Sequence, residues 1–420
     1  MKKTTIPYFR PDIRRDEIDE VVTALRSGWL TTGPRVKRFE EDFRASVGGR
    51  HAVAVNSATA ALHLAVEALG LKAGQAVLVP TMTFAATAEV VRYMGAVPLL
   101  VDCDSETGNL DLADAARKMA DLRAGRLSPR LPREARVVGM IPVHVGGLML
   151  DMDVVSSWAK ARGLWVVEDA AHAFPAAYRK SARSRWRRCG QKTAAVSCFS
   201  FYANKTITTG EGGMAVTDDR ALADRMRLMS LHGLSHDAWD RYRGGRTWDY
   251  RIMAPGFKYN LTDVAAAIGV HQLARSEEMR RARERVARRY LERLGGIEEL
   301  ELPPAPPDRI HAWHLFPIRL RLDRLRIDRS RFMEELKKAG VGCSVHWRPL
   351  HLHPYYTKTF GWRKADLPAA TALWPRVVSL PIFPGMRDHE IAAVCGAVSD
   401  LCRRFGRMPV GARKDVARRK

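Results

Sequence analysis

Between residues 51 and 217, short apolar runs alternate with segments of helical periodicity, and this alternation constrains the fold more than any other feature of the sequence. The runs are continuous and rich in β-branched residues, which is typical of strands buried on both faces of a parallel sheet. The expected strands lie at 51–55, 76–79, 96–101, 135–144, 163–169, 196–201 and 213–218. The predicted fold class is therefore α/β, with ligands at the carboxyl ends of the strands.

The pattern changes after "APGFKYNLTD", which points to a second, smaller α/β domain. A chain of 420 residues that is 46% hydrophobic is long enough to form two cores. We predict a large α/β domain over 1–255, a small C-terminal α/β domain over 256–405 and a flexible basic tail over 406–420. The elements expected in the small domain are one long basic helix or two broken near Ser276 (262–295), a strand (314–322), a helix that begins at Asp328 or Ser330 and stops at Gly340, a strand (341–347) and a final helix (387–406).

Positive charge is concentrated in two short segments, although the formal net charge of the whole chain is +23. Residues 179–192 carry seven basic residues and no acid, and residues 403–420 carry eight against Asp415 alone. Local segments of this kind attract polyanions loosely, or they are simply solubilising surface. No helix-turn-helix, zinc finger or aromatic RNA-binding motif accompanies the charge, so a specific nucleic-acid partner is not expected. The remaining positive charge suits an anionic small substrate.

No apolar run is long enough to span a bilayer, and the first residues lack the apolar core of a signal peptide. The six cysteines form no CxxC pair. A reducing, cytoplasmic location is therefore expected.

Two predicted strand ends carry groups that suit an anion and a heterocycle. Ser57, Ala58 and Thr59 follow the first strand and open a helix, so they either form an ordinary N-cap or hold a phosphate on free N–H groups. Asp169 ends the strand of "VVEDAAHA", where it either caps the next helix or pairs with a protonated ring nitrogen.

Two further strand ends carry an aromatic ring and an amine. Phe84 in "PTMTFAATA" either packs in the core or stacks on a planar ring. In "SFYANKTITTGEGG", Ser200 lies on a strand and Lys205 follows it, as a solvated residue or as a desolvated nucleophile. Taken together and in this order, the four strand ends describe a cofactor with a phosphate, a ring, a ring nitrogen and an aldehyde. That cofactor is pyridoxal 5′-phosphate bound as a Schiff base to Lys205.

From about Ile6 to Gly406 the chain resembles the DegT/DnrJ-type sugar aminotransferases, a family of the pyridoxal-phosphate fold type I. The resemblance rests on "SGWLTTGPRVKRFEEDF", "NSATAALHLA", "PTMTFAATA", "VEDAAHA", "SFYANKTITTGEGG", "GFKYNLTDVAAAIGVHQL" and "SLPIFPGM". "LMSLHGLSHDAWDRY", "HAWHLFPIRL" and "VHWRPLH" resemble in particular the branch that makes UDP-4-amino-4-deoxy-L-arabinose. The family fold implies a large domain with a mostly parallel sheet of the seven-stranded type and a smaller C-terminal α/β domain.

The resemblance also implies a role for each matching residue. Lys205 and Asp169 would be the catalytic pair, and His172 would lie near the 3′-oxygen of the cofactor. Asn260 would reach the phosphate of the neighbouring site in a homodimer, and His346 would line the sugar pocket. The cofactor-binding residues implied are Ser57, Ala58, Thr59, Phe84, Asp169, His172, Ser200, Lys205 and Asn260.

The activity implied is ping-pong transfer of an amine from L-glutamate to a nucleotide-linked keto-sugar, most closely a UDP-4-keto-sugar. Amination at C3, or of a dTDP- or GDP-linked sugar, stays open. Three features depart from the family pattern: Thr206 replaces the usual Asn, Phe84 stands where the arabinose branch has Trp, and the 179–192 segment is unusually basic.

Three other classes of function are the alternatives to an enzyme. A zinc site would use His346, His351 and His353, but Pro349 and Pro354 prevent a regular helix and no cysteine has ligand spacing, so no metal is expected. A polyanion-binding protein rests on charge alone. A family member without catalysis, acting as a sensor, is disfavoured by the presence of Lys205 and Asp169.

Overall fold

The computed structural model describes residues 5–129, 131–132, 134–235 and 251–407. Most of the predicted basic tail, residues 408–420, lies outside the described residues. In the described part of the chain, no helix combines the length and the apolar character that crossing a membrane requires.

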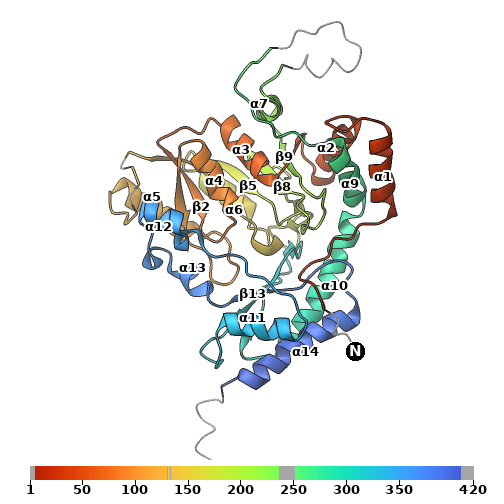
Figure 1. Ribbon diagram of the computed structural model, residues 1–420. Helices are drawn as coiled ribbons and strands as arrows, with labels where there is room; N and C mark the ends of the chain where they lie inside the picture. Colours follow the sequence, from red (N-terminus) through yellow and green to blue (C-terminus); the bar gives the residue numbers. More distant parts are fainter. Residues whose placement is uncertain (1–4, 130, 133, 236–250, 408–420) are drawn as a thin grey trace, which may run out of the picture.

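A seven-stranded sheet forms the centre of the upper half of the molecule in Figure 1. Its strands, in spatial order, are β1 (His51–Val55), β9 (Gly213–Thr217), β8 (Val196–Ser200), β5 (Trp165–Asp169), β4 (Arg136–Met140), β2 (Gln75–Pro80) and β3 (Val97–Val101). Only β9 runs antiparallel to its neighbours β1 and β8. The prediction of an α/β fold with a mostly parallel sheet is confirmed.

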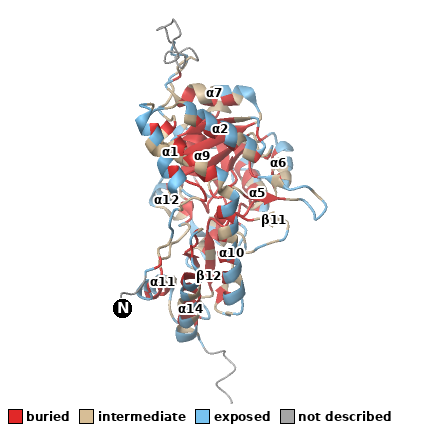
Figure 2. Cartoon of the chain, turned by 90° about the vertical axis from the view of Figure 1, so that its right-hand side faces the viewer, coloured by how far each residue is buried: buried red, intermediate tan, exposed pale blue. Residues whose placement is uncertain are grey.

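Helices pack around this sheet. The strands are apolar on both faces, and such strands need helices to bury them. They are α1 (Arg15–Arg26), α2 (Pro34–Val47), α3 (Ala58–Ala68), α4 (Ala86–Tyr93), α5 (Leu112–Arg123), α6 (Met152–Lys160), α7 (Arg220–Ser230) and α9 (Asp263–Ala274). Helix α3 contacts β1, β5, β8 and β9, so its first turn lies where several strands end. Figure 2 shows that buried residues fill the sheet and the helix faces that cover it.

Five phenylalanines form the densest aromatic cluster beneath β8 and α2. Phe43 on α2 is fully buried and lies 4.8 Å from Phe174, 4.9 Å from Phe199 and 5.3 Å from Phe201, measured between ring centroids. Phe39, one helical turn earlier, contacts both Phe43 and Phe201. Tilted and edge-to-face rings of this kind add to the stabilisation from burial alone, and they fix α2 against the strand that precedes Lys205.

A second core lies in the lower half of Figure 1, around the sheet β10 (Leu300–Glu301), β12 (Phe316–Leu320) and β13 (Val377–Leu380). Helices α10 (Ser276–Leu294), α11 (Arg329–Lys338) and α14 (Asp388–Phe405) contribute to it. The predicted break of the long basic helix near Ser276 is confirmed, because α9 ends at Ala274 and α10 begins at Ser276. Asp328, not Ser330, caps α11 by accepting a hydrogen bond from the Arg331 N–H. The domain boundaries at 255 and 405 stay predictions.

Shorter elements connect the two parts. They are the sheet β11 (Arg309–Ile310), β6 (Ala177–Tyr178) and β7 (Arg187–Arg188), the 3-10 turns η1 (Val145–Gly147), η3 (Leu350–Leu352) and η4 (Lys364–Asp366), and the helices α12 (Pro354–Phe360) and α13 (Pro368–Leu373).

The predicted strand at 341–347 is wrong. This segment makes only isolated bridges, between Val341 and Ile6 and between Ser344 and Ser379. Alternating apolar residues at 341, 343 and 345 produced the prediction, but the segment passes the edge strand β13 and leads to the cavity described below, where His346 and Trp347 lie. Tertiary position therefore overrode a local β pattern.

We predict that Phe43→Ala lowers the free energy of unfolding by about 3–5 kcal/mol, because it removes a fully buried ring from the aromatic cluster. Leu25→Ala, a change on α1 at a residue 53% exposed, serves as the control and is expected to have an effect within about 0.5 kcal/mol. Urea denaturation followed by circular dichroism measures both. Equal midpoints for the two variants would contradict the assignment of this cluster as a principal core.

Candidate active site

A cavity of about 540 Å³ opens where the carboxyl ends of β1, β5 and β8 meet the start of α3. Its lining includes nine of the ten site residues predicted from the sequence, namely Ser57, Ala58, Thr59, Phe84, Asp169, His172, Ser200, Lys205 and His346. The parallel order of the strands explains why Ser57, Asp169 and Lys205, up to 148 positions apart, converge at one edge of the sheet, and His346 joins them from the segment 341–347. Such a converging edge is the usual ligand site of this kind of sheet.

Lys205 lies five residues beyond the end of β8, in the loop that leads to β9. Its side chain is partly buried, and its Nζ lies 3.4 Å from Nε2 of His314. Burial lowers the pKa of Lys205 to about 8, the negative charge of Asp169 opposes that change, and the positive charge of Arg283 adds to it. A substantial fraction of this amine is therefore neutral and nucleophilic near neutral pH.

Asp169 is the last residue of β5 and is buried. Its carboxylate accepts a hydrogen bond of 2.8 Å from the Thr87 hydroxyl and one of 3.1 Å from the Ala171 N–H. Burial raises the pKa of Asp169, while the bonds from Thr87 and Ala171 and the charge of Lys205 work in the opposite direction. The arrangement leaves a buried carboxylate, held in a fixed position, in the same cavity as the amine.

Ser57 is the N-cap of α3, and its Oγ accepts a hydrogen bond of 3.1 Å from the Ala60 N–H. The ordinary capping role considered from the sequence is therefore realised. Ala58 and Thr59 occupy the first helical turn. The N–H groups of this turn have no intrahelical partner and form the positive end of the helix dipole. Gly213 passes close by, because a Cβ at that position would lie 2.4 Å from the carbonyl carbon and oxygen of Ser57.

Four residues complete the predicted lining. Phe84 is 64% exposed, so it is not a core aromatic and its ring is free to stack on a ligand. His172 is buried and stacks on Trp347 with 4.9 Å between ring centroids, and its Nδ1 atom has no hydrogen-bond partner among the described residues. His346 Nδ1 lies 2.9 Å from the Ser379 hydroxyl, and burial lowers the pKa of His346 to about 4. Ser200 ends β8.

Asn260 is the predicted site residue that the cavity does not include. Its Nδ2 donates to the Thr32 hydroxyl at 2.8 Å, and its Oδ1 accepts from Lys258 Nζ at 2.5 Å. Asn260 is bridged to Val55 at the end of β1, so it lies near the sheet edge without reaching the lining. Its predicted role in a neighbouring site stays a prediction.

Two residues of the site, the cavity residue His314 and the buried Thr87 behind it, were not predicted from the sequence. Thr87 bonds Asp169 from the first turn of α4, and His314 contacts Lys205 from the segment before β12. "HAWHLFPIRL" resembles a block of the family, and the histidine within its apolar run is the signal in the sequence that points to His314. No local pattern marks Thr87, because its role depends on a contact across 82 residues.

The histidines of the zinc alternative are occupied separately by protein groups. His351 lies between the hydroxyls of Thr81 and Thr371, at 2.8 and 2.9 Å, and His353 contacts the Arg348 carbonyl at 3.2 Å. His346 faces the cavity instead. Each of the three imidazole rings therefore has its own, separate surroundings.

The scan against protein families matches residues 11–399 with the DegT/DnrJ/EryC1/StrS aminotransferase family. The chain belongs to this family. It is 42% identical to the spore coat polysaccharide biosynthesis protein SpsC of Bacillus subtilis over 94% of this chain and 97% of that protein. It is 41% identical to the uncharacterized protein MJ1066 of Methanocaldococcus jannaschii over 96% of this chain and 98% of that protein.

Solved structures of the family have the same fold. The putative sugar aminotransferase Spr1654 of Streptococcus pneumoniae, in its PMP-form, superposes with a TM-score of 0.84 at 28% identity, over 95% of this chain and 98% of that one. Its PLP-form gives the same TM-score at 27% identity, over 95% and 99%. The predicted family, the fold type and the pyridoxal-phosphate cofactor of the family are confirmed.

The residues of the cavity fit this cofactor. The first turn of α3 and the nearby hydroxyls offer a binding site for a phosphate. Glycine is required at position 213, because a Cβ there would collide with the backbone of this turn at Ser57 and Ala58. The buried carboxylate of Asp169 matches a ring nitrogen, and the unpartnered Nδ1 of His172 matches a ring oxygen. Lys205 supplies the amine.

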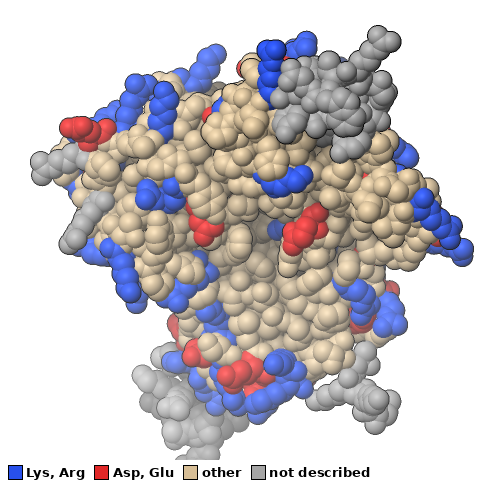
Figure 3. All heavy atoms as spheres, turned by 45° about the horizontal axis from the view of Figure 1, so that its top comes forward, with Lys and Arg blue, Asp and Glu red and all other residues tan. Residues whose placement is uncertain are grey.

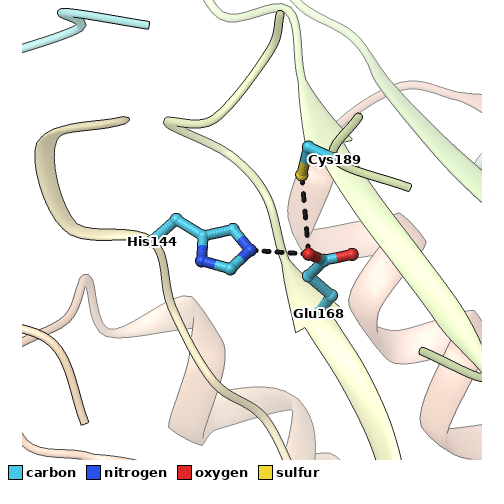
Figure 4. Close-up of side chains that lie close together, drawn as sticks. All are labelled: His144, Glu168 and Cys189. Atoms are coloured by element: carbon cyan, nitrogen blue, oxygen red, sulfur yellow. Dashed lines mark hydrogen bonds and ion pairs between the residues drawn. The ribbon is translucent and has the colours of Figure 1, made fainter. Parts of the chain in front are cut away.

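Glu168, the residue before Asp169, is the centre of a buried polar network (Figure 4). Its carboxylate lies 2.6 Å from His144 Nε2 and accepts hydrogen bonds from the hydroxyls of Thr193 and Ser197, at 2.6 and 2.5 Å, and from the Cys189 thiol at 3.6 Å. Burial alone would raise the pKa of Glu168, but the bonds from His144, Ser197 and Thr193 outweigh it and lower that pKa.

The same network is the one cluster of metal-ligand type in the described residues, with donor atoms of His144, Glu168 and Cys189 within 4.8 Å of one another. Burial raises the pKa of the Cys189 thiol well above its ordinary value, so the sulfur is a poor ligand. The carboxylate is already satisfied by four protein donors. The cluster is therefore a structural support beneath Asp169.

We predict that Glu168→Gln lowers the free energy of unfolding by about 3 kcal/mol at pH 7, because the amide cannot accept all four hydrogen bonds. The folded-state pKa of Glu168 is lower than its ordinary value of 4.5, so its ionisation stabilises the wild type above pH 4.5 and this contribution is lost as the pH falls below that value. The difference in the free energy of unfolding between wild type and Glu168→Gln therefore becomes smaller as the pH falls below 4.5.

Urea midpoints at pH 7, 5.5 and 4 measure this effect. Glu292→Gln is the control, since Glu292 is half-exposed and pairs only with Arg289 on the surface. If the difference in urea midpoint between wild type and Glu168→Gln widened as the pH fell, the ionised state of Glu168 would be contradicted.

Proposed function

We propose that this chain converts a nucleotide-linked keto-sugar to the amino-sugar with L-glutamate as amino donor, using pyridoxal phosphate. The observation that carries the proposal is the meeting of Lys205, Asp169 and the first turn of α3 in one cavity. The relatives support it, because the family is one of aminotransferases and SpsC is named for polysaccharide biosynthesis.

Each residue of the cavity then has a defined task. Ser57, Ala58, Thr59 and Ser200 hold the phosphate, Phe84 stacks on the ring, and His172 contacts the ring oxygen. Lys205 holds the cofactor through its amine, and Asp169 holds a proton on the ring nitrogen. When bound, the cofactor supplies an electron sink for the carbanion formed at the substrate carbon.

Proton transfer is the work of Lys205. Its Nζ, with a pKa of about 8, would take the proton from the α-carbon of the amino donor and deliver it to the cofactor carbon on the other side of the nitrogen that joins donor and cofactor. The same amine repeats the transfer in reverse for the keto-sugar. Because donor and acceptor use one cavity in turn, ping-pong kinetics are expected.

The finer substrate assignment is a UDP-4-keto-sugar, supported by the resemblance of "HAWHLFPIRL" and "VHWRPLH" to the arabinose branch. Amination at C3, or of a dTDP- or GDP-linked sugar, is the alternative, because Phe84 departs from that branch at the sugar pocket. His346, at the mouth of the cavity, is proposed to contact the sugar. The proposed place of action is the cytoplasm, where nucleotide sugars and reduced cysteines are found together.

We predict that the purified protein with pyridoxal phosphate has a visible absorption band that fades on addition of L-glutamate, and that Lys205→Ala lacks this response. Among the described residues, Lys205 is the only lysine that lines the cavity, and we expect the turnover of the variant to fall by at least about 1,000-fold. Lys72→Ala, at an exposed lysine, is the matched control and should behave as wild type. A protein that stays colourless with the cofactor would return the sensor and polyanion alternatives to first place.

We also propose that the active unit is a homodimer in which Asn260 serves the neighbouring site. Mixing the inactive Lys205→Ala and Asn260→Ala chains, with subunit exchange, should then restore about a quarter of wild-type activity, since half of the dimers would hold one intact site of two. Activity of the mixture is the measurement, and each variant alone is the control. If the chains have exchanged and the mixture still shows no activity, the shared site is contradicted. Full activity of Asn260→Ala alone would contradict it as well.

A further inference from the structure

The amine of Lys205 has one side-chain hydrogen-bond partner in the described part of the chain, Nε2 of His314 at 3.4 Å. His314 is buried and lines the same cavity. The chemistry proposed above does not use it, since no role was assigned to any residue of "HAWHLFPIRL". A buried imidazole in contact with the reactive amine therefore needs an explanation.

The backbone on both sides of His314 is fixed from two directions. Ala312 and Leu315 donate to the carbonyls of Gly147 and Gly146 in η1, each at 3.1 Å. From the opposite side, Arg283 on α10 donates to the Trp313 and His314 carbonyls at 3.3 and 3.5 Å. The ring is thus held toward Lys205 by elements of both cores, independently of the amine itself.

His314 is neutral in this environment. Burial lowers its pKa well below the ordinary value, and His172, Lys205, Arg283 and His346 all act in the same direction. Its ring lies 4.1 Å from the ring of His172 between centroids, and in the part of the chain that the structure describes its Nδ1 has no hydrogen-bond partner. A neutral imidazole can accept from an ammonium through one nitrogen, or donate to a neutral amine in its other tautomer.

We propose that His314 is a positioning residue that holds the free amine of Lys205 inside the cavity while substrate occupies the site. The inference rests on the proposed function, because that function requires Lys205 to act as a free base. Without this partner, a long lysine side chain has several rotamers available and must be reordered before each proton transfer.

The other charged groups that face Lys205 do not provide this contact. Asp169 and Arg283 act on it through charge, the first raising and the second lowering the pKa of the amine. His172 is buried and His346 is partly buried, and this burial lowers the pKa of both. The hydrogen bond to His314 is therefore the feature that a substitution can remove without changing the charge of the cavity.

The test measures the protonation of Lys205 in the full chain freed of cofactor. Trace acetylation with acetic anhydride between pH 6 and 10, followed by mass spectrometry of the Lys205 peptide, gives the apparent pKa of this amine; wild type is expected near 8. His314→Leu should shift the curve to lower pH by about one unit, because an ammonium loses more than a neutral amine when a charge-assisted bond is removed. His314→Gln keeps an acceptor and should stay within about 0.3 units of wild type.

His311→Leu is the matched control. His311 is also buried and stacks on Trp313 with 3.9 Å between centroids, but its Nδ1 accepts from the Trp313 N–H instead of contacting Lys205. It should lower the melting temperature and leave the acetylation curve unchanged. An unshifted curve in His314→Leu, or an equal shift in His311→Leu, would overturn the proposal. If His314→Leu does not fold, His314→Ala is compared with His314→Gln in the same way.

Steady-state kinetics of the holoenzyme supply the second readout. His314→Leu should lower kcat about tenfold, with little change in KM for L-glutamate, and His314→Gln should recover most of it. An increase in KM with kcat unchanged in His314→Leu would contradict a positioning role. The acetylation curve needs neither cofactor nor turnover. A protein that never binds pyridoxal phosphate would therefore sink the proposed function, whereas an unshifted curve in a working transaminase would sink only the role of His314.

Discussion

The pairing of β5 with β8 is the constraint on which the site depends. In this parallel pair Asp169 lies opposite Cys198, so the carboxylate reaches the sheet edge at the point where β8 turns into the loop of Lys205. Burial pushes both groups toward their neutral forms, and each charge opposes that effect on the other. Neither group would have its properties alone, since an unpaired buried charge is costly. A small change in the position of either strand end would therefore alter both groups at once.

The last two residues of β5 show how a strand separates support from chemistry. Successive side chains point to opposite faces, so Glu168 and Asp169 enter different surroundings. Glu168 meets four donors, and its pKa falls. Asp169 meets fewer donors in a buried cavity, and its pKa rises. Two adjacent carboxylates thus differ in role because of their environments, which the letters "VVED" do not reveal.

Features set by local sequence could be predicted, and features set by distant contacts could not. The buried strands, the break at Arg275 and the Asp328 cap follow from apolar runs and capping chemistry within a few residues. The cavity residues Ser57, Asp169 and Lys205 followed from strand ends. The loop at 341–347 and the contacts of Thr87 and His314 depend on partners 35 to 335 residues away, where local pattern carries no information. The proposed role of Asn260 in a neighbouring site involves a second chain altogether.

The positive charge of the chain lies mainly away from the cavity. In the 179–192 segment, Arg187 pairs with Asp153 and Arg179 stacks on Trp186, while Lys180, Arg183 and Arg185 are exposed. Lys and Arg side chains likewise scatter around the periphery of the face shown in Figure 3. The net charge of +23 therefore says little about how a substrate is bound.

The cavity lining itself holds two carboxylates, Asp169 and Glu211, against the single ammonium of Lys205, counted over the described residues. A nucleotide diphosphate brings at least two negative charges, and it is bound most effectively by guanidinium groups or clustered N–H groups. The first turn of α3 is already assigned to the phosphate of the cofactor. Within the described residues, the lining of this cavity thus lacks the cations that the proposed substrate needs. In the proposed homodimer, a second chain would supply them in the same association that would bring Asn260 to the site, so the proposed substrate and the proposed dimer depend on each other.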